Sequence, residues 1–265
     1  MKGWLVGLAL FVVVVASGVG LWITWDSTQT SSADPVVAAS NQALTNRTTT
    51  TSAVSPPTTV AVPGCEPADQ VVTGDPNAEW STMVIDPAHR LPDSYAPPDL
   101  VDATAAGFES RDQVRAIVVE DLAALRSGAE ANGSPIAVIS GYRSFDYQRN
   151  LFQDRVDEVG DVEAALRTAR PGHSEHQLGT AIDVLEPGVG ELTTDFALTA
   201  AGQWLAAHAH EYGFVISYPD GQSERSCYEY EPWHLRYVGR ETAAAIHDAG
   251  TTPREWMFAQ GNSDG

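Results

Sequence analysis

The chain has 265 residues, 43% of them hydrophobic, and a formal net charge of −20 with a pI near 4.5. This length allows one full domain with appended segments, and the hydrophobic content is ordinary for a globular core. The excess of acidic residues argues against a nucleic-acid partner, because nucleic-acid binding needs basic stripes that neutralise phosphates.

Residues 1–25 are predicted to be a membrane anchor. An apolar segment covers residues 4–25 and follows Lys2, the only lysine. As a helix its 22 residues would span roughly 33 Å, enough for a hydrocarbon core of about 30 Å. A signal peptide cleaved after Ala16 is the alternative. No basic residue follows until Arg47, so the positive-inside rule predicts a single-pass protein of the cell membrane with the rest of the chain outside.

Residues 26–64 are predicted to be a disordered linker. They are rich in Ser, Thr, Ala and Pro and end in SPPTTVAVPG. Such a composition buries too little apolar surface to offset the entropy lost on ordering. A flexible chain of 39 residues has a root-mean-square span of about 35 Å, so this segment is expected to be a tether.

The folded domain is predicted to cover residues 65–265, and it contains the only two cysteines, Cys65 and Cys227. In a chain outside the cytoplasm, two cysteines favour one disulfide, with two buried free thiols as the alternative. A bridge that closes so long a loop would contribute about 5 kcal/mol in the chain-entropy model.

The first half of the domain is predicted to alternate between short strands and helices. A strand is expected over residues 82–85, followed by a proline-punctuated passage that a helix would not tolerate. Apolar residues at three- and four-residue intervals predict a helix over residues 111–132. A compact apolar strand over residues 135–140 and a helix capped by Ser144 or Asp146 come next.

The second half of the domain continues with short elements. A helix over residues 161–168, a strand over residues 179–185 and a helix over residues 196–212 are expected, the last closed by Gly213. Further strands are predicted over residues 214–218, 228–230 and 234–238, and helices from Arg240 and Pro253. Short strands that do not alternate regularly with helices predict an α+β fold, with a small, largely antiparallel sheet flanked by helices.

Three side chains in two short stretches could hold a metal ion. PGHSEHQLGTAIDV, residues 171–184, places His176 seven residues before Asp183, and EPWH, residues 231–234, supplies His234. Catalytic zinc typically has three protein ligands, imidazoles and often one carboxylate, and lowers the pKa of a bound water to about 7. The spacing differs from the helical H-E-x-x-H motif of the better-known zinc proteases. A single His-x6-Asp pair is equally compatible with ordinary core and surface roles.

Two further charged residues fit a hydrolytic metal site. Glu231 lies three residues before a proposed ligand and could take the proton of the water. Pro232 keeps the backbone between Glu231 and His234 off a regular ladder, which lets the two side chains converge. Arg143 lies at a predicted strand-to-helix corner, from which it could reach a pocket; a surface salt bridge is the alternative.

Four blocks of this sequence resemble the LAS peptidases of bacterial cell walls, and among them the VanY-type D-alanyl-D-alanine carboxypeptidases. The blocks are WSTMVIDPAHRLPDSYAPPDLV, SGYRSFDYQ, SEHQLGTAID and EPWH. They occur in family order across roughly 155 residues, from Trp80 to His234. The resemblance implies that His176, Asp183 and His234 bind zinc. This set leaves His173 no more than a lining role.

The resemblance also implies roles for residues that do not bind the metal. Glu231 would be the general base, and Arg143 would stabilise the oxyanion. Gln148 and Ser174 match the substrate-contact positions of the family. The serine D,D-peptidases use lysines in S-x-x-K and K-T-G motifs, so a chain whose only lysine is Lys2 cannot belong to them.

The resemblance implies a zinc-dependent D,D-carboxypeptidase that removes the terminal D-alanine from peptidoglycan stem peptides. Other substrates within the family remain as alternatives: D-Ala-D-Ala dipeptide, L,D-linked peptides or peptidoglycan cross-links. A non-catalytic, zinc-stabilised wall-binding module is the alternative from another class. Glu231 and Arg143 argue against that module, because a structural zinc needs neither.

Overall fold

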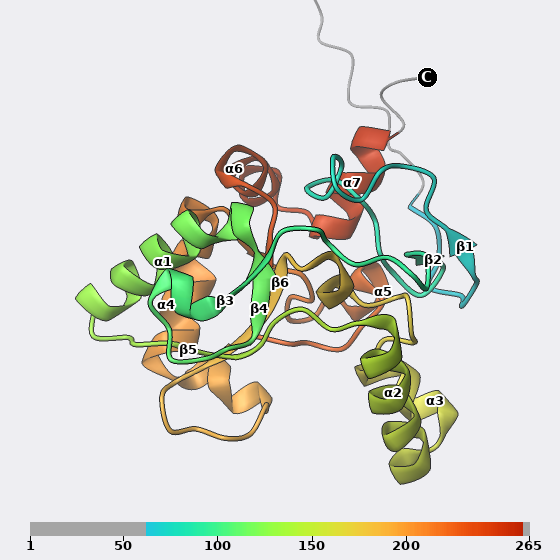
Figure 1. Ribbon diagram of the computed structural model, residues 1–265, viewed down its shortest axis with the longest axis horizontal. Coiled ribbons are helices and arrows are strands. Elements are labelled where there is room, and N and C mark those ends of the chain that lie inside the picture. Colours follow the sequence, from blue (N-terminus) through green and yellow to red (C-terminus); the bar gives the residue numbers. More distant parts are fainter. Residues whose placement is uncertain (1–61, 262–265) are drawn as a thin grey trace, which may run out of the picture. The chain divides into compact units, whose positions relative to one another are not determined.

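A computed structural model describes residues 62–261 and shows a mixed α+β fold around a four-stranded sheet (Figure 1). The α+β class predicted from the sequence is confirmed. The predicted anchor, residues 1–25, and most of the predicted linker, residues 26–64, lie outside the described residues. Among residues 62–261, no helix is both long enough and apolar enough to span a bilayer.

The central sheet has the strand order β5-β6-β8-β7 and is antiparallel throughout. Its strands are β5 (Ala137–Ser140), β6 (Ala181–Leu185), β8 (His234–Tyr237) and β7 (Phe214–Ile216). The register pairs Asp183 with His234 on one side and with Ser140 on the other. Strand pairing therefore brings together residues that are about 50 and about 40 positions apart in the sequence.

Alternation along the strands divides the two faces of the sheet between a core and a polar site. Ile182 on β6 and Leu235 on β8 belong to the main hydrophobic cluster. Because successive side chains in a strand point to opposite faces, Asp183, His234 and Arg236 must lie on the other face. The same pattern that builds the core thus gathers the charged residues.

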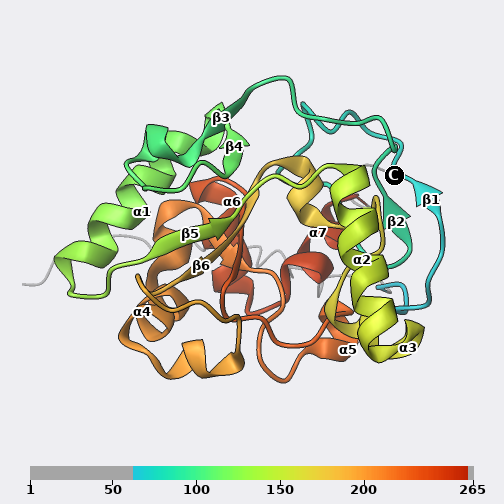
Figure 2. The same ribbon diagram turned by 60° about the horizontal axis from the view of Figure 1, so that its bottom comes forward.

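Seven α-helices and several short elements complete the described part of the chain (Figures 1 and 2). The α-helices are α1 (Val119–Ala131), α2 (Phe145–Val159), α3 (Asp161–Arg167), α4 (Ala200–His208), α5 (Ser223–Ser226), α6 (Arg240–Ala249) and α7 (Pro253–Gly261). The 3-10 helices are η1 (Ala103–Ala106), η2 (Ala116–Val118), η3 (Glu175–Leu178), η4 (Thr194–Leu198) and η5 (Ala209–Tyr212). Parallel β1 (Gln70–Val71) and β2 (His89–Arg90) form one ribbon, and antiparallel β3 (Leu100–Asp102) and β4 (Gln113–Arg115) form another.

Helices α1 and α4 cover the apolar face of the sheet. Leu122 and Leu125 of α1 and Leu205 of α4 are fully buried with Ile182 and Leu235 in one cluster. Each such side chain contributes about 2 to 3 kcal/mol when buried. Figures 1 and 2 show α2 and α3 packed together, away from α1 and α4. In the segment from β5 to α2, the N–H of Arg143 donates to the carbonyl of His176 at 3.3 Å, so this segment lies on the polar side of the sheet.

Several local predictions are confirmed within a few residues. Strand β5, helix α3, strand β6 and the helices that start at Arg240 and Pro253 all occur where the sequence indicates. Of the two capping candidates for α2, the structure uses Ser144, whose Oγ accepts a hydrogen bond from the N–H of Tyr147 at 3.2 Å. The helix predicted over residues 196–212 is divided into η4, α4 and η5, and it is closed by Gly213 in the left-handed conformation.

The prediction of a helix over residues 111–132 is wrong for its first third. Residues 113–115 form β4, which pairs with β3, and α1 begins only at Val119. The side chain of Ile117 is 44% exposed, so the apolar spacing that indicated a helix does not mark one buried face. Pairing with β3 makes residues 113–115 a strand instead, in which Val114 and Arg115 are buried.

The strands predicted over residues 82–85 and 228–230 are also absent from the described structure, because their backbones have other partners. The carbonyl of Met83 and that of nearby Trp80 accept hydrogen bonds from Arg236. The N–H of Glu229 donates to the carbonyl of Leu166. Neither segment offers its backbone to a neighbouring strand.

A disulfide joins Cys65 to Cys227, with a Cα–Cα distance of 5.2 Å and a sequence separation of 162 residues. The guanidinium of Arg254 lies nearby and donates to the carbonyls of Pro63 and Gly64. The start of the described chain is therefore held close to the segment that leads to Glu231.

Candidate metal centre

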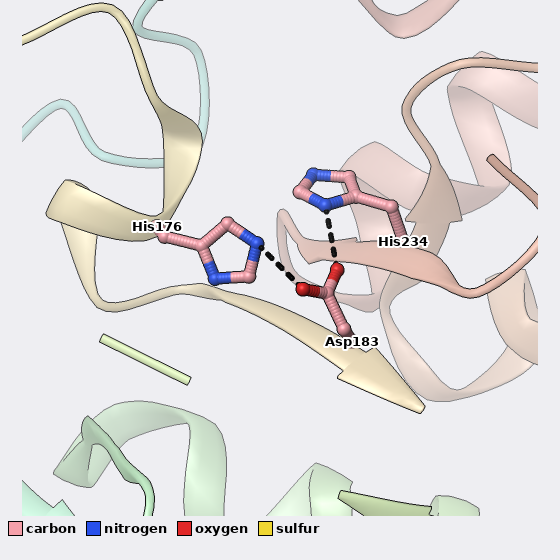
Figure 3. Close-up of side chains that lie close together, drawn as sticks. All are labelled: His176, Asp183 and His234. Atoms are coloured by element: carbon pink, nitrogen blue, oxygen red, sulfur yellow. Dashed lines mark hydrogen bonds and ion pairs between the residues drawn. The ribbon is translucent and has the colours of Figure 1, made fainter. Parts of the chain in front are cut away.

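His176, Asp183 and His234 converge on the polar side of the sheet (Figure 3). Each offers one ligand atom, and these atoms lie within 4.8 Å of one another. All three side chains are buried. His176 comes from η3, Asp183 from the centre of β6 and His234 from the first position of β8. The structure thus brings together the three residues that the sequence proposes as ligands.

The ring of His176 is neutral and presents Nε2 to the centre. Its Nδ1 lies 2.7 Å from the carbonyl oxygen of Gly141, which can only accept, so Nδ1 carries the proton. Nε2 faces Nη2 of Arg143 at 2.7 Å and Oδ2 of Asp183 at 3.3 Å. Burial and the positive charge of Arg143 lower the pKa of His176 to about 4. Neutral imidazole is the form that binds metal ions.

The ring of His234 faces a carboxylate at each nitrogen. Nε2 lies 2.9 Å from Oε2 of Glu175, and Nδ1 lies 3.1 Å from Oδ1 of Asp183. Burial by itself would lower the pKa of His234, but the two carboxylates outweigh it and raise the pKa to about 10. A cation bound at Nδ1 would take the place of the proton there, while Nε2–H could still donate to Glu175.

The carboxylate of Asp183 is ionised. Burial opposes the charge, but His176 and Arg143 lower the pKa of Asp183 well below its usual range. Its two oxygens are shared, since Oδ1 faces His234 and Oδ2 accepts from Nη2 of Arg143 at 2.5 Å. Asp183 therefore supplies a permanent negative charge at the point where the imidazoles meet.

This donor set fits zinc. Two imidazole nitrogens and one carboxylate oxygen are typical of catalytic zinc, whereas calcium and magnesium prefer oxygen ligands alone. Each imidazole also points its other nitrogen at a hydrogen-bond acceptor, Gly141 for His176 and Glu175 for His234. Such an acceptor on the second nitrogen is the usual arrangement for histidines that bind a metal.

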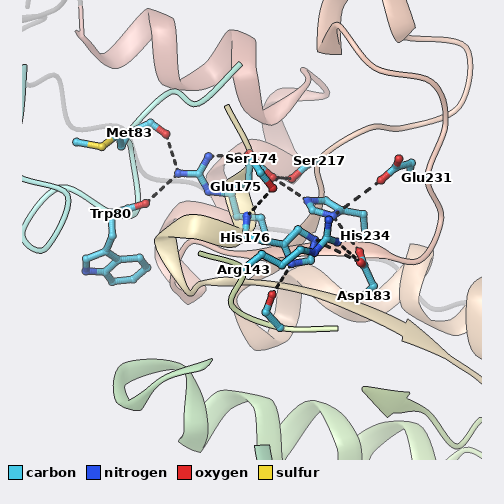
Figure 4. Close-up of polar contacts among 12 residues, drawn as sticks. Trp80, Met83, Arg143, Ser174, Glu175, His176, Asp183, Ser217, Glu231 and His234 are labelled. Carbon is cyan, nitrogen blue, oxygen red and sulfur yellow. Dashed lines mark hydrogen bonds and ion pairs between the residues drawn. The ribbon is translucent and has the colours of Figure 1, made fainter. Parts of the chain in front are cut away.

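Glu231 lies at the edge of the three ligands without joining them (Figure 4). Its Oε2 is 3.9 Å from Nδ1 of His234, and its side chain is 17% exposed. Burial is the main cause that raises the pKa of Glu231 to about 7, and the nearby charge of Asp183 adds to it. The carboxyl group can therefore gain or lose a proton near neutral pH, as a general base requires.

Arg143 reaches the centre from the corner between β5 and α2. Besides its contacts with His176 and Asp183, its Nε donates to Oγ of Ser140 at 3.1 Å. Its Nη1 donates to Oε1 of Gln148 at 3.3 Å. The guanidinium is thus held beside the ligand atoms, where it could stabilise negative charge that develops on a substrate.

The two proposed substrate contacts lie beside the centre and already have protein partners. Gln148 is buried, accepts from Arg143 and donates to the carbonyl of Ala169 at 2.8 Å. The hydroxyl of Ser174 accepts from the N–H of His176 at 3.3 Å and caps η3. Each residue helps to place a neighbouring site residue, and direct contact with a substrate stays a prediction for both.

His173 lies apart from the ligand set. Its Nδ1 faces the carbonyl oxygen of Asp86 at 2.8 Å, and its Nε2 faces Oδ1 of Asp69 at 3.1 Å. Both ring nitrogens are therefore directed at other parts of the chain. This contact connects the segment before η3 to the start of the described chain.

The structure adds residues that the sequence patterns did not single out. Glu175 is only 5% exposed and contacts His234 directly. Tyr218 stacks on the ring of His234, with a centroid distance of 4.8 Å. The buried Arg236 lies two residues after His234 on the same strand. Of these three residues, only Arg236 could have been noticed in the sequence, as an arginine between the apolar residues of a predicted strand.

Comparison with known proteins places this arrangement in a family. The family model for VanY D-alanyl-D-alanine carboxypeptidases matches residues 111–240. The provisionally named carboxypeptidase YodJ of Bacillus subtilis (strain 168) is 40% identical over 186 residues, which are 68% of this chain and 68% of YodJ. This chain belongs to the VanY-type LAS peptidases.

Two solved structures extend the comparison of this VanY-type chain. The LdcB LD-carboxypeptidase has 36% sequence identity and a TM-score of 0.59, covering 65% of this chain and 83% of that one. A variant of the vancomycin resistance D,D-pentapeptidase VanY, in complex with Zn(II), has 28% identity and a TM-score of 0.59, covering 68% and 99%. VanY-type proteins similar to this chain thus carry both L,D and D,D names.

Proposed function

We propose that this protein is a zinc-dependent D,D-carboxypeptidase that removes the terminal D-alanine from peptidoglycan stem peptides. One observation carries the proposal. Glu231 and Arg143 flank a buried set of two histidines and one aspartate without either completing it as a ligand. A purely structural metal would need neither residue and would close its fourth position.

His176, Asp183 and His234 would hold the zinc. When bound, the ion would polarise the carbonyl of the scissile bond and lower the pKa of a water molecule, as zinc does in other hydrolases. Glu231 would take the proton of that water and pass it to the amine that leaves. Its partial burial and its 3.9 Å approach to His234 suit this role, because the carboxylate reaches the centre and remains open at one edge.

Arg143 would stabilise the negative charge that develops on the carbonyl oxygen of the substrate. Gln148 supports this role, because it donates to the carbonyl of Ala169 and accepts from the Arg143 guanidinium, so it fixes the direction of that side chain. A donor held in place before the reaction loses little energy to reorganisation when the charge forms.

An L,D-carboxypeptidase is the second candidate function, favoured by the 36% identity to LdcB. The D,D-carboxypeptidase activity is supported by the family model and by the similarity to the VanY structure. Both activities need the same catalytic groups, and they differ in the chirality of the residue before the scissile bond. Mass spectrometry of products from pentapeptide, tetrapeptide and D-Ala-D-Ala dipeptide would decide between them.

The experiment that tests the metal proposal measures zinc in the purified protein by atomic absorption. We expect one zinc per chain, and activity that is lost with a chelator and restored by added zinc. His176→Ala should lose the metal, because it removes one of three ligands. If the His176→Ala protein retains stoichiometric zinc, the ligand assignment is refuted.

We also propose that the enzyme is anchored in the cell membrane by residues 4–25 with its domain outside. The proposal rests on the sequence, namely an apolar run of 22 residues preceded by Lys2. This position would suit a peptidoglycan substrate, which lies beyond the membrane.

A further inference from the structure

Glu175 is a buried acid that contacts one histidine ligand and precedes the other in sequence (Figure 4). Its Oε2 accepts from Nε2 of His234 at 2.9 Å and from Oγ of Ser217 at 2.6 Å. Its Oε1 accepts from Nη1 of Arg236 at 2.8 Å. Both oxygens are thus engaged, and the carboxylate is not free to become a further metal ligand.

Arg236 is itself fixed by the surrounding backbone. It is 1% exposed, and its Nη2 donates to the carbonyls of Trp80 and Met83 at 2.9 and 2.7 Å. His234 and Arg236 are two residues apart on β8, so their side chains leave the same face of the sheet. The strand therefore presents an imidazole and a guanidinium to the same carboxylate.

The contact between Glu175 and His234 determines which ring nitrogen can bind a metal. A carboxylate can only accept a hydrogen bond, so Nε2 of His234 must keep its proton to satisfy Glu175. The lone pair for a metal is then left to Nδ1, which faces Asp183 at 3.1 Å. Without Glu175, the carboxylate that contacts the ring most closely would be Asp183 at Nδ1, which favours a proton on Nδ1 in place of the lone pair that a metal needs.

We propose that Glu175 is a positioning residue that holds His234 in the form that binds the metal through Nδ1, and that Arg236 and Ser217 hold Glu175 in turn. Because Glu175 and His176 are adjacent in η3, one short turn then places both histidine ligands. The inference rests on the proposed zinc site, and it assigns Glu175 no direct contact with metal or substrate.

The test compares the zinc affinity of the wild-type protein with that of Glu175→Leu, which removes the acceptor for His234, by competition with a chromophoric chelator. Loss of such a partner typically weakens metal binding by 10- to 100-fold, and we expect a loss in this range. The matched control is Asp86→Asn, which disrupts another buried acid–arginine pair, Asp86 with Arg254 at 2.7 Å. The control should leave zinc affinity within twofold of wild type.

A second variant separates positioning from a general need to balance buried charge. Glu175→Leu also leaves Arg236 without its charge partner, which destabilises a folded protein for reasons unrelated to zinc. The double variant Glu175→Leu with Arg236→Met removes both charges and leaves no acceptor for Nε2 of His234. If Glu175 positions His234, the double variant regains stability but its zinc affinity stays 10- to 100-fold low. If zinc affinity returns with stability, the inference is wrong.

A third measurement needs no variant. In the zinc-loaded wild-type protein, nitrogen-15 NMR of the His234 ring should show a metal-bound Nδ1 and a protonated Nε2. A metal-bound Nε2 would overturn the inference. If the wild-type protein binds no zinc, the proposed function fails with it, whereas equal zinc affinity in wild type and folded Glu175→Leu refutes the positioning role alone.

Discussion

Replacing Glu231 by glutamine should separate catalysis from metal binding. The substitution keeps the size of the side chain and removes its ability to accept a proton. In the described structure Oε2 of Glu231 approaches Nδ1 of His234 only to 3.9 Å, whereas Oδ1 of Asp183 lies at 3.1 Å. All three proposed ligands therefore remain in Glu231→Gln.

The expected loss of activity follows from the role of the base. Proton transfer by a positioned side chain commonly contributes about 10²- to 10⁴-fold to the rate, which corresponds to roughly 3 to 5 kcal/mol of barrier. We expect kcat for D-alanine release to fall in this range. Stability should not decrease, because glutamine is nearly isosteric and avoids placing a charge in a mostly buried position.

The assay combines D-alanine release with zinc content measured on the same preparation at a slight excess of zinc. Glu229→Gln is the matched control, since its side chain is 46% exposed and pairs with Arg167 at 3.0 Å, and the substitution should leave kcat unchanged. A Glu231→Gln protein that holds zinc and releases D-alanine at a near wild-type rate would refute the assignment of the base.

Three further outcomes are expected. Arg143→Ala should retain zinc and lose about 10²- to 10³-fold in kcat, the loss expected when one oxyanion donor is removed. Arg143→Lys should restore only part of the lost kcat, because an ammonium lacks the planar fork of a guanidinium. Equal rates for Arg143→Ala and wild type would contradict this role. Asp86→Asn should lower the free energy of unfolding in urea by about 3 kcal/mol, because it leaves the buried Arg254 guanidinium without its charge partner. Burial opposes the charge of Asp86, but its hydrogen bonds with Arg254 and His89 lower its pKa below 3.8; the stabilisation is therefore complete above the unfolded pKa of about 4 and is lost as pH falls through the lower folded pKa. An equal gap between the two proteins at pH 7 and pH 2 would contradict that reasoning. Cell fractionation should find the full-length protein in membranes with its domain open to external protease, and soluble protein that begins near Ser17 would exclude the anchor.

Local sequence signals were sufficient where a single segment decides its own structure. Ser144 precedes α2 and caps it through a contact three residues away, and Gly213 closes η5 because glycine accepts a positive φ. Prediction from local spacing failed at residues 113–115, where pairing with β3 outweighs the helical spacing of apolar residues. A partner strand that lies outside the local window cannot be detected by periodicity alone.

The residue types of the candidate site were also readable in the chain. The His-x6-Asp spacing alone left ordinary core and surface roles open, but the motifs SEHQLGTAID and EPWH, through which the chain resembles the VanY-type peptidases, carry all three proposed ligands and the proposed base. The ability to bind a metal or accept a proton belongs to the side chains themselves. Candidate ligands and a candidate base can therefore be identified from the sequence without knowledge of the fold.

What only the tertiary structure decided is how each ligand is oriented. The register of β6 against β8 places Asp183 opposite His234, and the alternation along β8 adds Arg236 to the same face. Glu175 becomes a partner of His234 across 59 residues of sequence. The choice of ring nitrogen depends on such neighbours, because an imidazole has two nearly equivalent nitrogens and only its surroundings determine which one keeps the proton.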